Sequence, residues 1–393
     1  MLKRFPRLSE TFIAAELLEL RRQGEHVSVI AVAKPAEIAI HGFLDDLDVS
    51  VTYLPHRPLR QPLRTTAGVV TAIVASPRGW SSAARTCLWP PRILGLRKLL
   101  QASVLLRELR HQDATHAHAH FATAAAGLAE LAQRMGGPTY SVTTHAKDIW
   151  HEEVSAEALR AKLGRARFVA TVSAANVEHL TDVLGPNPPV HLVPNSVDTR
   201  RLRAGERDTE PGRVLAVARL VEKKGLGDLV AACGLLVERQ PLHLVIVGEG
   251  PLRAPLVEQA GSLGVELELC GAQPREVVLE ELRRADIFAL PCVVAADGDR
   301  DGLPTSVLEA MALGVPVVTT AVNGLVDAVL DGDTGLIVPQ RDPVALAEAL
   351  RRLLDDPVLA ARLSASARRH IESSFALEKS VNILRSLFPG VPA

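Results

Sequence analysis

The sequence predicts an α/β protein of two doubly wound, Rossmann-like domains that face each other across a cleft. Apolar, strand-like runs alternate with helical runs along the whole chain, as parallel α/β layers require. The length of 393 residues is typical of two domains, and a polar stretch at 203–212 separates halves of similar size. Ligands of such folds bind beyond the carboxyl ends of the strands, so we expect the site in the cleft.

The N-terminal domain is predicted to span residues 1–202. Its strand-like runs are short and apolar, and the longer runs between them have helical composition. We expect strands at 26–33, 49–54, 115–118, 139–144, 168–172 and 190–193, and helices at 10–23, 93–111, 121–135, 156–165 and 174–184. Only residues 2–5 remain for an opening strand, so we expect this strand to be short or truncated.

The C-terminal domain is predicted at residues 213–374, after a linker at 203–212. We expect strands at 213–218, 242–247, 266–270, 287–290, 315–319 and 335–338, and helices at 225–239, 251–263, 275–284, 305–313, 343–355 and 357–373. A last helix is expected near 377–388.

Composition excludes several classes of protein. The chain carries 44 Lys and Arg against 45 Asp and Glu, so it is not a nucleic-acid binder as a whole. Its four cysteines show no paired spacing, and three lie in apolar runs, which favours buried thiols in a reducing compartment. No secretory signal is visible, and the longest uncharged apolar stretch, 67–75, is too short to span a bilayer. We therefore expect a cytoplasmic protein.

The most informative segment is residues 301–312. Asp301 and Glu309 lie eight residues apart, across a Gly/Pro turn that opens a helix for which Thr305 or Ser306 is a suitable cap. A helix N-terminus offers free N–H groups and a positive dipole end, which suit a diphosphate. The segment therefore predicts an anion site between two carboxylates that can hold hydroxyl groups, formed by Gly302, Leu303, Pro304, Thr305 and Ser306.

A calcium loop is the alternative interpretation of this segment. Residues 297–302 copy the first half of an EF-hand, which needs a bidentate Glu at its twelfth position. Counted from Asp297, the twelfth residue is Leu308, and Glu309 falls one place late. The run before the loop also resembles a strand and not an entering helix, so we favour the anion site. An acidic solvated loop would explain Asp297 and Asp299 alone.

Two further loops of the C-terminal half carry candidate residues. Arg219 and Lys224 follow the strand at 213–218, where two cations can hold a diphosphate, although such residues are usually just solvated. Lys223 is the expected bystander, because Lys224 directly precedes Gly225. Gly248 and Gly250 join a strand to a helix, and a nucleotide contact and a purely structural turn are both open there.

Histidines mark the N-terminal half. His145 ends a strand and is followed by Lys147 and Asp148, which can orient it or contact an acceptor. His116, His118 and His120 alternate and so share one strand face. With no Cys or carboxylate ligand near them in sequence, we expect no metal site, and we expect His118 or His120 to line the cleft. Ser9 and Glu10 open a helix, as caps or as cleft residues.

These segments together resemble glycosyltransferase family 4, whose retaining members transfer sugars from nucleotide-sugar donors and have the GT-B fold. Residues 301–309 resemble the family's acidic-x7-acidic motif, and the other matching segments follow the family's order at 9–13, 118–122, 144–148, 171–173, 193–198, 218–225 and 248–251. The variant resembles enzymes of bacterial exopolysaccharide biosynthesis, such as that of colanic acid. The resemblance implies that the last helix, within 375–393, packs back on the N-terminal domain.

The resemblance also implies roles for single residues. It implies that Arg219, Lys224 and the amides of 302–306 stabilise the leaving diphosphate, that Glu309 holds the ribose, and that Asp301 holds the sugar. It places His145 beside the transferred hexose, and it implies that no metal or other cofactor is needed. The family usually has Glu where this chain has Asp301, whose side chain is one methylene shorter.

Two other functions stay open at this point. A sugar-nucleotide epimerase shares the two-domain fold, but it needs an acid/base pair that the sequence does not show. A catalytically weak sugar-nucleotide-binding partner would fit the shortened Asp301 and the short opening strand.

Residues 55–110 are unusual in charge. They contain ten Arg or Lys and one acid, Glu108, together with Trp80 and Trp89. Basic residues with interfacial aromatic residues suit an anionic membrane surface, and a merely solvated basic face is equally open. On the first interpretation the protein would be peripheral on the inner face of the membrane.

Overall fold

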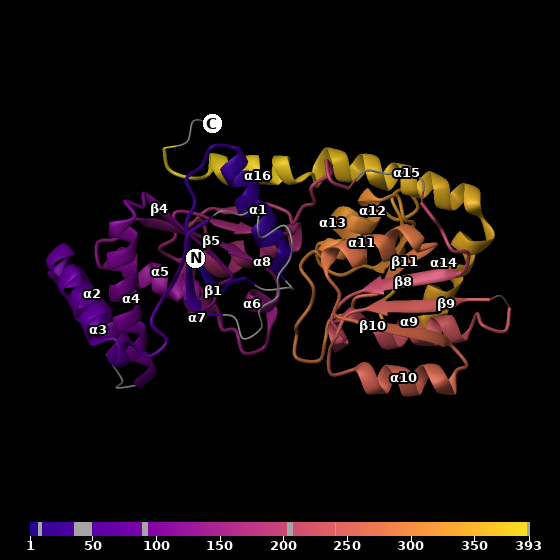
Figure 1. Ribbon diagram of the computed structural model, residues 1–393, viewed down its shortest axis with the longest axis horizontal. Helices are drawn as coiled ribbons and strands as arrows, with labels where there is room; N and C mark the ends of the chain where they lie inside the picture. Colours follow the sequence, from indigo (N-terminus) through magenta and orange to yellow (C-terminus); the bar gives the residue numbers. More distant parts are fainter. Residues whose placement is uncertain (7–9, 35–48, 89–92, 203–206, 240, 391–393) are drawn as a thin grey trace.

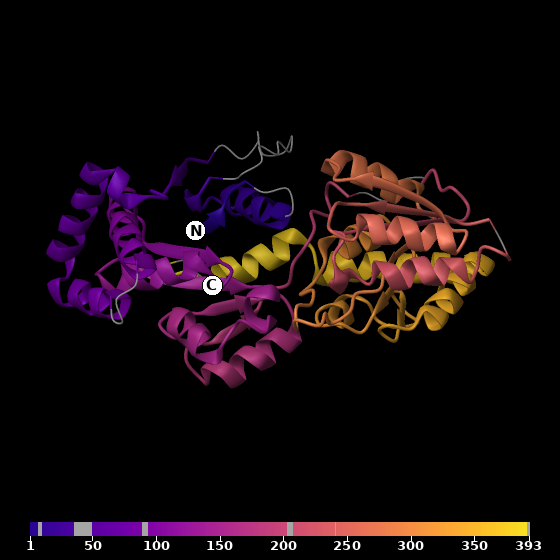
Figure 2. The ribbon, with the colours of Figure 1, turned by 90° about the horizontal axis from the view of Figure 1, so that it is seen from below.

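The computed structural model of the chain describes residues 1–6, 10–34, 49–88, 93–202, 207–239 and 241–390. It has two α/β domains side by side, joined by two chain crossings (Figures 1 and 2). All strand pairs between named strands are parallel. The predicted fold of two doubly wound domains is confirmed.

The N-terminal domain has two parallel sheets, with strand orders β1-β2-β3 and β4-β5-β6-β7. Their strands are β1 (Leu2–Arg4), β2 (Val29–Ala33), β3 (Val51–Tyr53), β4 (His116–His120), β5 (Thr139–Thr144), β6 (Val169–Thr171) and β7 (Val190–Leu192). The helices are α1 (Thr11–Arg22), η3 (Pro58–Arg60), α2 (Pro62–Ala75), α3 (Pro77–Leu88), α4 (Ile93–His111), α5 (Ala124–Arg134), α6 (Lys147–Trp150), α7 (Ala156–Leu163) and α8 (Ala174–Leu184).

The C-terminal domain has one six-stranded parallel sheet of order β10-β9-β8-β11-β12-β13. Its strands are β8 (Arg213–Val217), β9 (His243–Val247), β10 (Glu266–Gly271), β11 (Ile287–Leu290), β12 (Val317–Thr320) and β13 (Leu336–Val338). Its helices are η4 (Glu222–Lys224), α9 (Leu226–Gly234), α10 (Arg253–Ser262), α11 (Arg275–Arg284), α12 (Thr305–Ala312), α13 (Leu325–Ala328), α14 (Pro343–Asp355) and α15 (Pro357–Ser374), and α16 (Leu377–Ser386) follows. The inner strands β8, β9, β11 and β12 are almost wholly buried, as a sheet covered on both faces requires.

Helix α16 leaves the C-terminal domain and packs on the N-terminal one, where Leu384 contacts Phe168 and Val193 (Figure 1). The two chain crossings lie beside each other, because Val197 N–H donates to Phe375 O at 3.0 Å and Leu377 N–H donates to Val197 O at 2.9 Å. The predicted linker lies partly outside the described residues. Its described end is fixed to the C-terminal domain, where the Arg207 guanidinium donates to Ala285 O at 2.9 Å.

Three local details differ from the sequence-based expectations. Helices α2 and α3 have no counterpart among the expected helices. Pro62 opens α2 without a side-chain cap, whereas Ser76 precedes Pro77 at the start of α3, where its Oγ accepts from Gly79 N–H at 3.0 Å. Helix α12 begins at Thr305 with Pro304 as its N-cap and no side-chain cap, so capping by Thr305 or Ser306 was wrong. Helix α9 ends at Gly234 and not at 239.

Candidate active site

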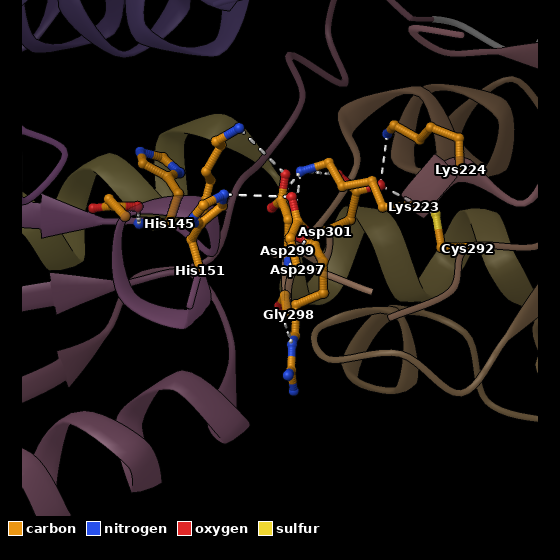
Figure 3. A network of polar contacts seen from close by, with 12 residues as sticks. His145, His151, Lys223, Lys224, Cys292, Asp297, Gly298, Asp299 and Asp301 are labelled. Atoms are coloured by element: carbon orange, nitrogen blue, oxygen red, sulfur yellow. Dashed lines mark hydrogen bonds and ion pairs between the residues drawn. The ribbon is translucent and has the colours of Figure 1, made fainter. Parts of the chain in front are cut away.

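The carboxyl ends of β8 and β11 bring two lysines of η4 against Asp301. Lys224 Nζ lies 2.7 Å from Asp301 Oδ2, and Lys223 Nζ lies 3.5 Å from Asp301 Oδ1. Lys223 also donates to Asp299 Oδ1 at 3.0 Å and is buried, so it belongs to the same charged cluster as Lys224. Sequence spacing could not reveal this, because both lysines point into the same acidic loop only when η4 forms (Figure 3).

Asp301 is a buried, ionised carboxylate. Burial alone would raise its pKa, but the charges of Lys224 and Lys223 outweigh burial and hold the pKa at about 2. The Cys292 thiol donates to Asp301 Oδ2 at 3.2 Å, and burial raises the pKa of that thiol well above its usual value. Burial lowers the pKa of Lys224, and Asp301 raises it more, so both partners stay charged. Arg219 lies exposed two residues beyond β8.

Glu309 is held by a residue that the sequence analysis missed. Arg275, the first residue of α11, places its Nε and Nη2 each 3.1 Å from Glu309 Oε1. Burial raises the pKa of Glu309, and Arg275 partly offsets that shift. A cation just beyond the carboxyl end of β10 was the available signal, since neighbouring parallel strands end at the same edge. The uncapped amides at the start of α12 lie between the Asp301 and Glu309 positions along the chain.

His145 lies across the domain boundary from these charges. Its ring contacts those of Phe12 and Phe121, with centroids 4.9 Å and 4.4 Å away, and its Nε2 is buried without a partner in the part of the chain that is described. Burial lowers its pKa to about 3, so the imidazole is neutral near pH 7. Asp148 accepts from the backbone N–H of His145 at 3.0 Å and of Ala122 at 2.7 Å, so it orients the His145 backbone.

The alternating histidines of β4 form a row with hydroxyl groups of β5. Ser141 Oγ lies 2.7 Å from both His116 Nε2 and His118 Nδ1, and Thr143 Oγ1 lies 2.9 Å from His118 Nε2. His120 continues the row toward the cleft, with its Nε2 3.1 Å from Glu16 Oε1 of α1. The expectation that no carboxylate lies near these histidines was therefore wrong, because α1 supplies one from a distant part of the sequence.

The remaining candidates are placed less decisively. Gly248 and Gly250 pack against the loop after β8, since a Cβ on either would lie 1.9 Å from Ala218 O or 2.4 Å from Leu220 O. This close backbone approach accounts for both glycines structurally. Glu10 is the N-cap of α1, and Ser9 lies outside the described residues. A cavity beside α1 is lined by Thr11, Phe12, Arg275, Thr305 and Glu309, among others, so it joins both domains.

The loop at 297–301 forms one of the contacts between the two halves of the site (Figure 3). Glu152 N–H donates to Asp297 O at 2.9 Å, and His151 Nε2 lies 3.4 Å from Asp297 Oδ2. The Arg300 guanidinium lies over the Trp150 ring at 4.2 Å from its centroid. Gly302 packs against the N-terminal domain too, because a Cβ there would lie 2.8 Å from Val172 Cγ2. The loop that carries Asp301 therefore packs against the N-terminal domain, and Glu309 lines the cavity between the two domains.

Comparison with known proteins agrees with this arrangement. Residues 9–201 match "Glycosyltransferase Family 4", and residues 198–370 match "Glycosyl transferases group 1". The chain is 34% identical over 257 residues to a GDP-mannose-dependent alpha-(1-6)-phosphatidylinositol monomannoside mannosyltransferase of Mycolicibacterium smegmatis, covering 61% of this chain and 67% of that protein. It is 34% identical over 195 residues to the amylovoran biosynthesis glycosyltransferase AmsK of Erwinia amylovora, and this match spans about half of each chain, 48%.

The fold has a close counterpart among solved structures. Anabaena Alr3699/HepE in complex with UDP and glucose superposes with a TM-score of 0.73 at 16% identity, covering 98% of this chain and 96% of that one. The GT-B fold and the family that the sequence motifs predicted are both confirmed. By its two consecutive family matches and its 34% identity to a relative that it covers to 67%, the chain belongs to glycosyltransferase family 4.

Proposed function

We propose that the protein transfers a hexose from a nucleoside-diphosphate sugar to a glycan or lipid-linked acceptor in polysaccharide biosynthesis, with retention of configuration and without a metal. The observation that carries the proposal is the pair of buried carboxylates, Asp301 and Glu309, on either side of an uncapped helix N-terminus with Lys224 beside it. The names of the relatives support the reaction class, since one is GDP-mannose-dependent and another acts in amylovoran biosynthesis.

The charged groups suggest how donor binding proceeds. In the structure Lys224 is paired with Asp301 at 2.7 Å. A diphosphate arriving at the start of α12 would compete for Lys224, and Asp301 would then be available to hydroxyl groups of the sugar. Lys224, Arg219 and the α12 amides would stabilise the negative charge that develops on the leaving diphosphate. Glu309 would hold the ribose, kept in place by Arg275.

The neutral groups suit the acceptor side. With a pKa of about 3, His145 presents a polar, uncharged edge to the transferred hexose, and the aromatic rings around it exclude water. His118, His120 and Asp148 act behind it in this proposal, through the row of imidazoles and the His145 backbone. The acceptor side also includes residues 55–110, where we expect an anionic membrane surface as partner.

Substitution of the two key charges tests the proposal. UDP- and GDP-sugars are first screened for thermal stabilisation of the protein, and transfer or donor hydrolysis is then measured with the one that binds. Glu309→Ala and Lys224→Ala should each lower turnover by about 10²–10³-fold, as loss of a contact to developing charge does. Lys379→Ala, on the surface of α16, is the matched control and should be silent. Wild-type turnover in both site variants would overturn the proposal.

A chelation experiment tests metal independence. Activity should survive excess EDTA, because the proposal assigns charge neutralisation to Lys224 and Arg219. Loss of activity with EDTA and its return with calcium alone would instead support a calcium loop at 297–309. A protein that binds the donor but neither hydrolyses nor transfers it would be a binding partner, and one that interconverts donor sugars would be an epimerase.

A further inference from the structure

Helix α2 turns an apolar face to the solvent. Four of its side chains are strongly exposed, namely Leu63 at 87%, Val70 at 54%, Ile73 at 40% and Val74 at 75%. Their spacing of seven, three and one residues places them on one side of the helix. We call these four residues the α2 face.

The orientation of α2 is fixed by its opposite side. Thr65, Gly68 and Ala72 are buried there, and Thr65 Oγ1 donates to Pro58 O at 2.7 Å. A Cβ on Gly68 would lie 2.9 Å from the backbone of Val104, so α2 and α4 are in close backbone contact. The helix therefore cannot rotate to bury the α2 face without losing this contact.

The surroundings of the α2 face are basic. Neither α2 nor α3 contains an acid, and the exposed arginines Arg57, Arg60, Arg78 and Arg85 lie just before α2 or within α3. Arg64, the one cation within α2, turns inward to Glu108, with its Nη2 2.9 Å from Glu108 Oε1. Glu108 is thereby neutralised, so the charge left exposed around the face is positive.

The aromatic residues have a different place from the one expected. Trp80 is only partly exposed and packs against the core of the N-terminal domain, and Trp89 lies outside the described residues. Leucines replace them as exposed apolar groups near α2, with Leu59 at 74% in η3 and Leu94 at 68% in α4. Helices α2, α3 and α4 form the end of the N-terminal domain that is farthest from the C-terminal domain (Figures 1 and 2).

Soluble surfaces rarely carry such apolar faces without a partner. A second copy of this chain would bring the same arginines together, so like charges oppose self-association through this face. An anionic lipid surface satisfies both features, because lipid chains accept the apolar residues and headgroups accept the arginines. None of the helices in the described part of the chain is long and apolar enough to cross a membrane.

A groove beside the face points to the same partner. Arg4, Lys34, His56 and Arg64 are among the residues that line a cavity of about 770 Å³ at the ends of β1, β2 and β3. Arg64 belongs to the first turn of α2, so the cavity adjoins the N-terminal end of that helix. A helix lying among lipid headgroups would bring this basic cavity close to the phosphate groups of the same leaflet.

We propose that the α2 face inserts into the headgroup region of an anionic membrane, with the flanking arginines bound to lipid phosphates. The inference deepens the proposed function, because it rests on a lipid-linked acceptor and assigns the surface that brings the enzyme to it. Insertion differs from the purely electrostatic recruitment that the basic sequence predicts. Salt should weaken recruitment, since the screening length falls to about 3 Å at 1 M, but bound protein should be retained in part by the inserted face.

Vesicle sedimentation of three variants tests the insertion. The first variant, Leu63→Ser/Val70→Ser/Val74→Ser, makes the face polar. Its matched control, Val257→Ser/Val344→Ser/Val358→Ser, changes equally exposed valines on helices of the C-terminal domain. The third, Arg57→Gln/Arg60→Gln/Arg78→Gln/Arg85→Gln, removes the flanking charge. Each is mixed with phosphatidylcholine vesicles with and without phosphatidylglycerol, at low salt and after a high-salt wash.

We expect wild type and control to bind the anionic vesicles alike. The face variant should bind at least about tenfold more weakly and lose all binding in the wash, and the arginine variant should bind no better to anionic than to neutral vesicles. Wild-type binding by the face variant, equal weakening in the control, or no vesicle binding by wild type would overturn the proposal. So would a dimer in analytical ultracentrifugation that the face variant dissociates.

Donor binding separates this inference from the proposed function. The face variant should keep the wild-type thermal stabilisation by nucleotide sugar, because α2 lies at the end of the N-terminal domain that is far from α12 (Figure 1). If the wild type is stabilised by the donor but does not bind vesicles, only the inference is refuted. Vesicle binding without donor stabilisation would refute only the proposed function.

Discussion

The two halves of the site treat charge in opposite ways. On the C-terminal side, buried charges occur in pairs, with Asp301 beside Lys224 and Glu309 beside Arg275. On the N-terminal side, His145 is buried among rings, has an unpartnered nitrogen and is neutral. Both sets of groups are largely buried, so the difference lies in their partners and not in their exposure to solvent. Paired charges can exchange partners with an incoming anion, whereas a neutral imidazole can meet sugar hydroxyls without attracting the phosphates.

Breaking a pair on the charged side should have the largest effect on stability. Lys224→Met leaves Asp301 buried with only the more distant Lys223, and loss of one partner of a buried pair costs about 3–5 kcal/mol. Adding Asp301→Asn should restore much of this loss, because no unpaired charge remains. Urea denaturation of both single variants and the double variant measures it. If the losses in free energy of unfolding of the two single variants simply add in the double variant, the pairing of Lys224 with Asp301 is contradicted.

The control for the Lys224 and Asp301 variants is an exposed ion pair. Arg351 contacts Glu348 at 2.7 Å and Asp355 at 2.6 Å on the surface of α14. Arg351→Met should change the denaturation midpoint far less than Lys224→Met does, because solvent screens the exposed charges. Equal effects at the two sites would mean that burial does not distinguish them.

The neutral His145 should make the stability of the protein depend on pH in the acidic range. The unfolded chain protonates His145 near pH 6.5, and the folded protein does so only near pH 3. The unfolded state therefore binds more protons between these values, and stability falls as the pH drops below 6.5. His145→Gln should remove about 2 kcal/mol of the loss between pH 7 and pH 5. Parallel stability curves for wild type and variant across this range would show that His145 takes up its proton normally.

The boundary between the halves should show the smallest effects. Arg300→Ala removes the contact with the Trp150 ring, and this loss should weaken the contact between the two domains by about 1 kcal/mol or less. Lys147→Ala should cost less still, about 0.5 kcal/mol at most, because the lysine side chain is 63% exposed and lies 3.7 Å from Asp299. Small-angle scattering of both variants, with and without donor, measures domain closure. A larger radius of gyration in Lys147→Ala than in Arg300→Ala would reverse this order.

Sequence patterns predicted the fold and the charged side better than the neutral side. The alternating runs located most strands, and the spacing of Asp301 and Glu309 with Lys224 located one edge of one sheet. Arg275 was missed and the contact of Lys223 with Asp299 was not predicted, because their partners are set by side-chain direction and not by spacing. Glu16 was missed for a different reason, since α1 meets β4 only after the domain has folded. The apolar face of α2 has a helical period, but no cap marked its start.

The row of imidazoles and hydroxyls on β4 and β5 has a consequence for where protons reside. Ser141 lies 2.7 Å from a nitrogen of His116 and 2.7 Å from one of His118, and its buried hydroxyl has one hydrogen to donate. Because a buried hydroxyl seldom leaves its hydrogen unbonded, one histidine accepts it and the other donates to the oxygen. Choosing the tautomer of His116 therefore fixes that of His118, and with it the direction of the bond to Thr143. The two rings therefore change tautomer together, and the row has only two alternative hydrogen-bond arrangements.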